Sequence, residues 1–307
     1  MKPLRIGITG ASGMIGRYLV DNWTNKDLIL YSSHNTDAGY PLFKRHSDPD
    51  QDELSPFVKL SDVIIHLAHD TSPIKSNFFF PNNFGENIAF TQRLISELQK
   101  DKLSKPPLLI YLSSGGTVYG NVKPIIGGIT ETQTTLPISP YGLEKLTCEN
   151  LLRLGAMRGC YKLVVLRASN VYGLPLVEDG NQGIIGVGLS RIKAGLPLII
   201  TSNPGVIRDY LHLQDLSVAI TQVIGAKLAE ESYCFNIGSG HGHSIENIIA
   251  LFKKITQIKI EIEGNQHEYS EYAPNWNVLN SDKLKNFIGW QPIISLETGI
   301  DSLWSAL

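Results

Sequence analysis

The sequence predicts an α/β fold, a doubly wound parallel sheet with a smaller C-terminal lobe, and three observations lead to it. Short, continuously apolar runs alternate with longer segments of helical periodicity. A glycine-rich loop follows the first of these runs. The chain has 307 residues, about twice the roughly 150 residues of an average domain, so it can bury a large core without disulfides or a structural metal.

The apolar runs are expected to be strands covered on both faces, because their apolar character is continuous rather than alternating. Parallel strands of this kind need crossover helices. Helical periodicity is clearest over 87–98 and 141–154. The predicted strands are 4–9, 28–31, 63–67, 108–112 and 163–166.

The second half of the chain has a looser pattern. After about Tyr172 it consists of loops and isolated helical segments, although 217–229 has a helical pattern and 232–237 is expected to add a late strand to the sheet. No Gly/Ser linker occurs in the last hundred residues or so. We therefore expect one domain over 1–172 and a lobe over 173–307 that is interleaved with late elements of the sheet.

Composition argues against several functional classes. The 27 Lys+Arg and 29 Asp+Glu residues leave a formal charge of −2, which argues against nucleic acid or anionic lipid as a partner. Three widely spaced cysteines fit reduced thiols in the cytoplasm, and nothing completes a metal site with His66 and His69. No apolar run reaches the ~18 residues of a membrane span, so a cytoplasmic protein without a metal is expected.

The glycine-rich loop, GITGASGMIG, predicts a dinucleotide-binding turn. Gly10, Gly13 and Gly16 have a GxxGxxG spacing between the first predicted strand and a helical stretch that begins near Met14 and Ile15. Such glycines let the backbone approach a pyrophosphate closely, while the next helix offers free N–H groups and the positive end of its dipole. We expect NAD(P) as the cofactor, bound by Gly10, Gly13, Met14 and Ile15.

The end of the second predicted strand lacks the carboxylate that usually binds the adenosine ribose. The stretch is LILYSSHNTDAG, with Ser32, Ser33 and His34 at the expected place and Asp37 too late in the chain. Without that negative charge a 2′-phosphate is not repelled, and the three residues, with Arg17, are candidate donors to it. This favours NADP(H) slightly over NAD(H), and a neutral ribose site that binds NAD is the alternative.

A tyrosine and a lysine follow the fourth predicted strand in the segment SPYGLEK. Tyr141 and Lys145 are at i and i+4, on one face of a predicted helix. An ammonium beside a phenol favours the phenolate and lowers the pKa of the phenol toward neutrality. The tyrosine then takes a proton from a substrate hydroxyl as hydride leaves the same carbon. The alternative is a surface tyrosine beside a solvated lysine, and the position after a dinucleotide loop favours the catalytic pair.

Nine motifs occur in order along nearly the whole chain: TGASGMIG, VIIHLAH, ENIAFTQRLI, YLSSGGTVYG, SPYGLEK, LRASNVYG, VIRDYLHLQDL, FNIGSG and IGWQP. In these motifs the sequence resembles the extended short-chain dehydrogenases/reductases of the NAD(P)-dependent nucleotide-sugar epimerase/dehydratase family, typified by UDP-galactose 4-epimerase. The resemblance implies a Rossmann-type NAD(P)-binding domain over 1–172 and a mainly nucleotide-sugar-binding lobe over 173–307. It also implies a nucleotide-diphosphate-sugar substrate and a homodimer.

The resemblance assigns roles to individual residues. It makes Tyr141 the catalytic base and Lys145 its partner and a ligand of the nicotinamide ribose. Leu67, Ala68 and Asn87 would lie beside the cofactor. The residues expected at the nucleotide sugar are Asn170 in SNVYG, Arg208 in VIRDY, whose planar fork suits a diphosphate, and Gln182 in a loop that borders the sugar.

One position departs from the family pattern. The catalytic Ser or Thr of the family usually stands five residues before the glycine of the VYG motif, and that position is Gly115 here. Ser114 and Thr117 are the candidate hydroxyls to hold the substrate oxygen in its place, with Ser113 also nearby. In a regular strand residues 115 and 117 share one face and 114 the other, which gives Thr117 a slight preference.

Two reactions fit these residues, the 4-epimerase ahead of the reductase. In an NDP-hexose 4-epimerase, Tyr141 deprotonates the C4 hydroxyl, hydride moves to the bound nicotinamide, and it returns to the other face of the 4-keto sugar. In an NADPH-dependent NDP-4-keto-6-deoxysugar reductase, Tyr141 donates the proton, and the missing ribose carboxylate supports this alternative. A 4,6-dehydratase is disfavoured because SSGGT lacks the Asp–Glu pair for water elimination. A non-catalytic nucleotide-binding sensor is disfavoured because Tyr141 and Lys145 are both present.

Overall fold

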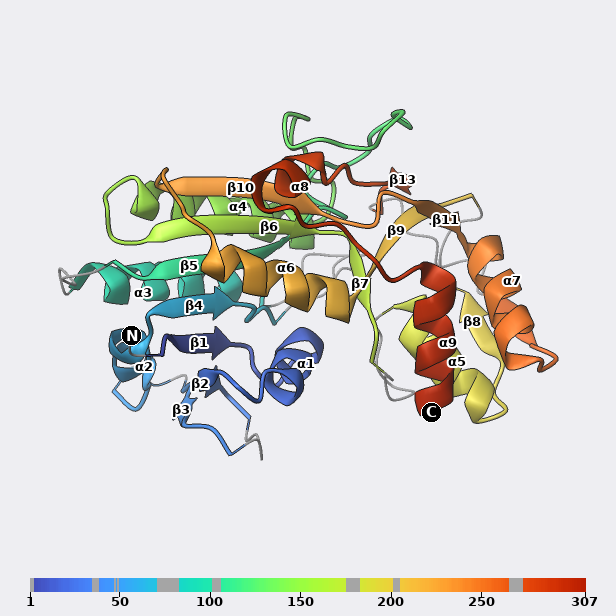
Figure 1. Cartoon of the computed structure of the whole chain (residues 1–307), viewed down its shortest axis with the longest axis horizontal. Helices are drawn as coiled ribbons and strands as arrows, with labels where there is room; N and C mark the ends of the chain where they lie inside the picture. Colours follow the sequence, from blue (N-terminus) through green and yellow to red (C-terminus); the bar gives the residue numbers. More distant parts are fainter. Residues whose placement is uncertain are drawn as a thin grey trace.

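The computed structural model describes residues 3–34, 39–46, 48, 50–70, 83–100, 106–174, 183–200, 205–264 and 273–307. Figure 1 shows one large sheet with helices on both faces and, beside it, a smaller lobe of short strands and helices. This arrangement confirms the α/β fold that the sequence predicts.

The large sheet is 7-stranded and parallel throughout, in the order β10-β6-β5-β4-β1-β2-β3. The chain winds outward from β1 in both directions, so the carboxyl ends of β1 and β4 flank the switch point where such sheets bind ligands. The strands are β1 (Arg5–Thr9), β2 (Asp27–Ser32), β3 (Leu42–Lys44), β4 (Val63–His66), β5 (Leu108–Ser114), β6 (Lys162–Ala168) and β10 (Ser232–Ile237). All five early strands and the late strand were predicted, whereas β3 was missed because it is a three-residue, half-buried edge strand.

Two layers of helices enclose the large sheet. On one face pack α1 (Met14–Asn22) and α6 (Leu213–Gly225). On the other face pack α2 (Leu54–Leu60), α3 (Glu86–Lys100) and α4 (Pro140–Ala156). Successive strand residues alternate between the two apolar layers, which explains why the strand sequences are continuously apolar.

The predicted helices have the right positions and imprecise ends. The segments 87–98 and 141–154 lie within α3 and α4. Helix α6 lies at 213–225 rather than 217–229, because the ring of His212 accepts a hydrogen bond from the Gln214 N–H and caps the helix there.

The smaller lobe is built on a 4-stranded sheet of β11, β9, β13 and β7, and a 2-stranded sheet of β8 and β12. Helices α5, α7 and α9 share an apolar cluster with Tyr172 and Tyr210, while α8 packs with α6 and β10 of the large sheet. The bounds are β7 (Asn170–Tyr172), α5 (Ile184–Lys193), β8 (Leu198–Ile200), β9 (Ile207–His212), β11 (Gly242–Ser244), α7 (Ile245–Thr256), β12 (Ile262–Gly264), β13 (Trp276–Asn277), α8 (Asp282–Ile288) and α9 (Leu296–Ala306).

A buried ion pair ties α4 to β6, the strand next to the β10 edge of the large sheet. Arg167 on β6 makes two parallel contacts with Glu149 on α4, at 3.1 Å from Nε to Oε1 and 2.7 Å from Nη2 to Oε2. The Ser113 hydroxyl on β5 donates to Glu149 Oε1 at 2.5 Å. The remaining guanidinium nitrogen donates to the Tyr119 hydroxyl at 3.0 Å, and Tyr119 donates to Asn236 Oδ1 on β10 at 2.7 Å. The network therefore spans three neighbouring strands and one helix.

Replacing Glu149 with Ala is expected to lower the free energy of unfolding by about 3–5 kcal/mol, because Arg167 is left buried without its counter-charge. The measurement is equilibrium denaturation in urea. Glu297→Ala, which breaks the exposed pair of Glu297 with Lys254, is the control and should cost less than about 1 kcal/mol. Equal losses in the two variants would show that the buried pair does not stabilise the fold.

Candidate functional site

The glycine loop leaves its backbone open at the carboxyl end of β1. Gly10 has a φ of +72°, and a Cβ at this residue would lie 2.7 Å from the Ala68 backbone nitrogen. Gly13 precedes α1 and provides no side-chain cap, so the N–H groups at the start of the helix, around Met14 and Ile15, are left for another acceptor. A backbone without side chains beside an uncapped helix start fits the pyrophosphate of a dinucleotide.

Leu67 and Ala68 follow β4 and lie against this loop. The Leu67 N–H donates to the Thr9 carbonyl at 3.2 Å, and the Ala68 N–H donates to Thr9 Oγ1 at 3.3 Å. Gly10 has the same two residues as its neighbours. The expected cofactor-binding segments that follow β1 and β4 are thus brought side by side.

His66 is a buried structural link between β1, β4 and α3. Its Nδ1 lies 2.8 Å from Thr9 Oγ1 and its Nε2 lies 3.3 Å from Thr91 Oγ1. Burial, together with the positive charges of Lys145 and Arg45, lowers the pKa of His66 to about 3. The ring is therefore neutral, and both of its nitrogens are engaged.

Tyr141 and Lys145 lie in the first two turns of α4. Ser139 caps this helix by accepting a hydrogen bond from the Gly142 N–H, and Pro140 occupies the first helical position. Lys145 Nζ donates to the Leu112 carbonyl at 2.9 Å and lies 5.7 Å from the centre of the Tyr141 ring. Burial lowers the pKa of Lys145 to about 8. The pair predicted from the YxxxK spacing is therefore formed.

The pKa of Tyr141 is raised rather than lowered. Desolvation is the largest cause, and the negative charge of Glu144 adds to it. A hydrogen bond with the Ser114 hydroxyl acts in the opposite direction. The expectation that an ammonium beside this phenol lowers the pKa of Tyr141 toward neutrality is therefore wrong for the protein by itself, because burial of the phenol raises that pKa.

Asn170 and Arg208 come together in the smaller lobe. Strand β7 pairs with β9, and Asn170 Nδ2 donates to the Asp209 carbonyl at 3.0 Å. Burial lowers the pKa of Arg208 to about 10, and among the described residues no carboxylate lies within ion-pair distance of it. An anionic ligand beside Arg208 would offset the free-energy cost of burying its positive charge. Gln182, the third residue expected at the substrate, lies outside the described residues.

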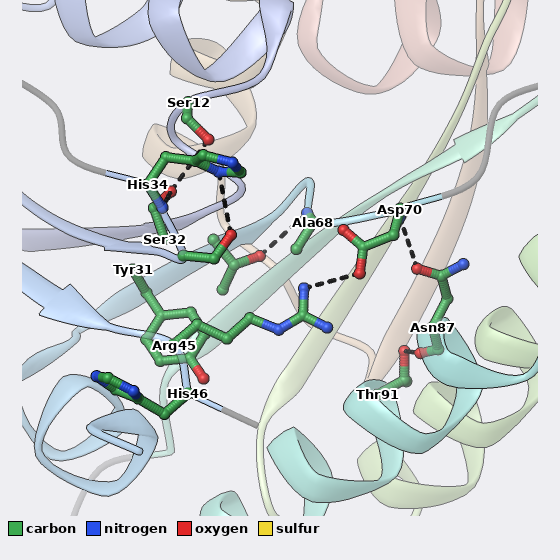
Figure 2. A network of polar contacts seen from close by, with 12 residues as sticks. Ser12, Tyr31, Ser32, His34, Arg45, His46, Ala68, Asp70, Asn87 and Thr91 are labelled. Atoms are coloured by element: carbon green, nitrogen blue, oxygen red, sulfur yellow. Dashed lines mark hydrogen bonds and ion pairs between the residues drawn. The ribbon is translucent and has the colours of Figure 1, made fainter. Parts of the chain in front are cut away.

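The predicted ribose region is a hydrogen-bonded turn at the end of β2, shown in Figure 2. Ser32 is buried, donates to Ser12 Oγ at 3.0 Å and accepts from the His34 N–H at 3.1 Å. Ser33 Oγ lies 3.1 Å from His34 Nδ1. Arg17 is exposed on α1, and Asp37 lies outside the described residues. Ser32 therefore joins the second strand to the glycine loop.

Arg45 stands beside this turn and was missed from the sequence. It follows β3, and its N–H donates to the Ser32 carbonyl at 3.1 Å. Its Nη1 lies 3.1 Å from Asp70 Oδ2, and its guanidinium lies 4.7 Å from the centre of the Phe90 ring. Figure 2 shows the side chain extending from beside Tyr31 and Ser32 toward Asp70. The signal in the sequence was a basic residue after the segment LFK, which is too short and too mixed to predict a strand.

Comparison with known proteins decides the family. A model described as "NAD dependent epimerase/dehydratase family" matches residues 6–238. The chain belongs to this family. A dTDP-4-dehydro-6-deoxyglucose reductase from Escherichia coli is 29% identical, covering 96% of this chain and 95% of that protein. A putative UDP-glucose 4-epimerase from Methanocaldococcus jannaschii is 26% identical, covering 95% of each.

A solved structure with the same fold is the UDP-glucose 4-epimerase of Thermotoga maritima with UDP-glucose. It is 25% identical, covers 98% of both chains and superposes with a TM-score of 0.85. Membership of the epimerase/dehydratase family confirms the resemblance seen in the motifs. Within the part of the chain that the structure describes, no helix has the length and apolarity that a membrane span requires.

The departure from the family pattern at Gly115 has a steric reason. A Cβ at Gly115 would lie 2.5 Å from Leu279 Cδ1 and 3.0 Å from the Arg167 carbonyl, so a side chain there would point into packed protein. Strand β5 ends at Ser114, and the Thr117 N–H turns back to the Ser114 carbonyl at 3.2 Å. The alternation of a regular strand, which favoured Thr117, therefore does not extend past Ser114. Ser114 contacts Tyr141, while Thr117 Oγ1 is buried and unpartnered among the described residues.

The variants Ser114→Ala and Thr117→Val test which of the two hydroxyls holds the substrate oxygen. Ser114→Ala is expected to lower kcat about 10²- to 10³-fold, the loss seen when one donor to the reacting oxygen is removed. Thr117→Val keeps the branched shape and should change kcat less than about tenfold. Steady-state kinetics of both variants, with folding checked by circular dichroism, gives the answer. The reverse ranking would assign the role to Thr117.

Proposed function

We propose that this protein moves a hydride to or from C4 of a nucleotide-diphosphate sugar, with Tyr141 exchanging the proton of the C4 oxygen. The observation that carries the proposal is the cluster of Tyr141, Ser114 and Lys145 where β5 ends and α4 begins. The glycine loop opens at the carboxyl end of the same sheet. Ligands of open α/β sheets bind along this edge, which supports a shared pocket for cofactor and sugar.

The chain's own residues handle the proton. Bound NAD(P) supplies the acceptor and donor of the C4 hydride. Tyr141 takes a proton from the C4 hydroxyl when C4 is oxidised and gives one to the C4 oxygen when C4 is reduced. Ser114, already hydrogen-bonded with Tyr141, holds the sugar oxygen beside it. Lys145 is positively charged below its pKa of about 8, and this charge stabilises negative charge on the Tyr141 oxygen.

The net reaction that we propose first is 4-epimerisation of an NDP-hexose through a 4-keto intermediate. Proteins named UDP-glucose 4-epimerase match this chain over nearly its whole length. With NAD(P) bound, the hydride taken from C4 would return to the opposite face of the sugar, so this reaction would consume no net reductant.

Reduction of an NDP-4-keto-6-deoxysugar is the second candidate. A relative named for such a reaction is 29% identical over 96% of the chain. The region at Ser32 that is proposed to bind the ribose also suits NADPH, which a reductase consumes. Both candidates use the same half-reaction at C4, so Tyr141 has the same role in each.

We place the nucleotide diphosphate at Asn170 and Arg208. A diphosphate would supply the negative charge that half-buried Arg208 lacks among the described residues, and an arginine fork matches its oxygens. Gln182 stays a prediction at the sugar end of this site. The homodimer implied by the resemblance also stays a prediction.

For the cofactor we propose a preference for NADP(H), with Arg45 as a donor to the 2′-phosphate. Arg45 is hydrogen-bonded to the strand that ends in Ser32, so its charge lies near the expected ribose. Its partner Asp70 is exposed at the surface, which leaves the pair open to exchange with a phosphate. The turn at the end of β2, beside Arg45, is formed by Ser32, Ser33 and His34.

Incubation of the purified protein with UDP-hexoses, and separately with an NDP-4-keto-6-deoxysugar plus NADPH, is expected to give conversion in one of the two assays. An epimerase interconverts the hexoses with no net use of nicotinamide, whereas a reductase oxidises one NADPH per product.

Tyr141→Phe should lower kcat at least ~100-fold with dinucleotide affinity nearly unchanged. Tyr233→Phe on β10 is the matched control. Turnover that survives in Tyr141→Phe would remove this residue from the mechanism.

Arg45→Gln is expected to weaken NADPH binding about 10- to 100-fold, as for loss of a hydrogen bond to a charged group. NADH binding should change less than about threefold, because it lacks the 2′-phosphate. Fluorescence titration of both dinucleotides measures the difference. Arg93→Gln, which breaks the ion pair between Arg93 on α3 and Asp52, is the control. An equal loss for NADH and NADPH would contradict a 2′-phosphate contact.

A further inference from the structure

Lys145 is a buried cation without a directly paired carboxylate in the part of the chain that the structure describes. The residue is 4% exposed, and its Nζ donates to the Leu112 carbonyl at 2.9 Å. None of the ion pairs among the described residues includes Lys145. A backbone carbonyl is a neutral acceptor, and burying a charge is costly unless other groups stabilise it. The question is therefore which neighbour stabilises this ammonium.

The face of the Tyr111 ring meets the ammonium. Lys145 Nζ lies 5.1 Å from the centre of the Tyr111 ring, closer than the 5.7 Å to the centre of the Tyr141 ring. A cation within about 6 Å of the centre of an aromatic face is attracted by the ring, and the attraction is stronger where water is excluded. Tyr111 is 1% exposed, so this contact lies in the protein interior.

One stretch of β5 supplies both contacts of the ammonium. Successive side chains of a strand point to opposite faces, and Tyr111 packs in the apolar layer of α3 and α4 while Leu112 packs in the opposite layer. The Tyr111 ring and the Leu112 carbonyl thus approach Lys145 from adjacent residues. The ring of His66 on β4 lies 5.3 Å from the Tyr111 ring, centre to centre, and helps to fix its orientation.

Tyr111 offers Lys145 its ring rather than its hydroxyl. The hydroxyl lies beside the thiol of Cys148, which is a weak hydrogen-bond acceptor, and it has no stronger partner among the described residues. The ammonium instead lies over the ring face. A phenyl ring at this position would therefore keep the contact that matters.

We propose that Tyr111 is a positioning residue for the reaction, and that its ring face takes the place of a counter-ion in holding the charged Lys145 ammonium beside Tyr141. The proposal rests on the proposed function only in taking Lys145 as the cation that stabilises negative charge on the Tyr141 oxygen. Tyr111 contacts neither substrate nor cofactor in this scheme. It acts through Lys145.

A ring suits this position better than a carboxylate. A carboxylate in contact with Lys145 would cancel the positive charge and place a negative charge near Tyr141, which would oppose loss of the tyrosine proton. A neutral ring stabilises the cation and leaves its charge available to the Tyr141 oxygen. An ammonium has three donors, so one serves the Leu112 carbonyl and two remain.

The other ionisable groups around Lys145 do not replace the ring contact. They are Tyr141, Glu144, Cys148 and Glu149 on α4, and His66 and His69 at the end of β4. The two carboxylates lie beyond ion-pair distance of Lys145, and Glu149 is paired with Arg167. Burial raises the pKa of the Cys148 thiol and lowers the pKa of both histidines, so these three groups are neutral at neutral pH.

The direct test is the titration of Lys145, followed by NMR in protein whose lysines are isotopically labelled at the ε-carbon. The Lys145 signal is assigned by its absence in Lys145→Met. In Tyr111→Leu, which removes the ring, we expect the pKa of Lys145 to fall by about 0.5–1.5 units, because the lost attraction favours the neutral amine. Tyr111→Phe keeps the ring and should shift that pKa by less than about 0.3 units.

Tyr161→Leu is the matched control. Tyr161 is also 1% exposed and lies in the same apolar layer, but its hydroxyl donates to the Leu152 carbonyl, about two turns along α4 from Lys145. This variant should lose stability without a change in the Lys145 titration. Equal Lys145 titrations in Tyr111→Leu and Tyr111→Phe would overturn the proposal.

A fluorinated ring tests the same contact without emptying the core. Fluorine atoms withdraw electron density from the ring face and weaken its attraction for a cation. Pentafluorophenylalanine in place of Tyr111 should therefore lower the pKa of Lys145 relative to Tyr111→Phe, even if Tyr111→Leu does not fold. A titration that coincides with that of Tyr111→Phe would refute the ring contact.

The pH dependence of kcat shows whether the contact serves the reaction. Raising the pH removes the Lys145 charge, so kcat is expected to fall on the alkaline side, and this limb should move to lower pH in Tyr111→Leu but not in Tyr111→Phe. A limb that stays in place while the Lys145 titration moves would overturn the role of Tyr111 in the reaction. The titration itself needs no substrate, so it gives its answer even if no nucleotide sugar is turned over.

Discussion

The ion pair between Glu149 and Arg167 is the constraint on which the site depends. It is buried, bidentate and shared with Ser113 and Tyr119, so α4 is fixed in both position and rotation against β5 and β6. Lys145 lies one turn before Glu149 on the same helix and reaches the Leu112 carbonyl of β5. With that turn fixed, Tyr141 is held beside Ser114 at the end of the same strand.

Helix α4 carries two fully buried glutamates, and their partners make them different. Glu149 faces an arginine, so the two charges offset each other and the result is rigidity. Glu144 accepts hydrogen bonds from the Gly85 N–H and from Asn87 Nδ2, so it joins α4 to the start of α3. Two glutamates five residues apart on one helix thus fix α4 against β6 in one case and against the start of α3 in the other.

The smaller lobe completes the site through Asp209. This buried carboxylate accepts hydrogen bonds from Ser239, from the Gly240 N–H and from the Leu279 N–H. It therefore holds Leu279 where that side chain fills the space beside Gly115. The lobe thereby removes the room for a side chain at position 115, and the hydroxyl in contact with Tyr141 comes from Ser114 instead.

The sequence by itself determined what local pattern and spacing encode: the parallel sheet, the glycine turn with its helix start, the Tyr141–Lys145 pair and family membership. Continuous apolar runs and a YxxxK spacing are properties of neighbouring residues, so they can be recognised without three-dimensional information. Only the tertiary structure decided what depends on contacts between distant segments. Arg45, which follows β3, donates its N–H to Ser32 on the neighbouring strand β2. Leu279 blocks position 115 from 164 residues away, and Glu144 meets His69 and Asn87 from other elements. Desolvation and charge, which set the pKa of Tyr141 above its usual range, arise from these packed neighbours, and no short stretch of sequence contains them.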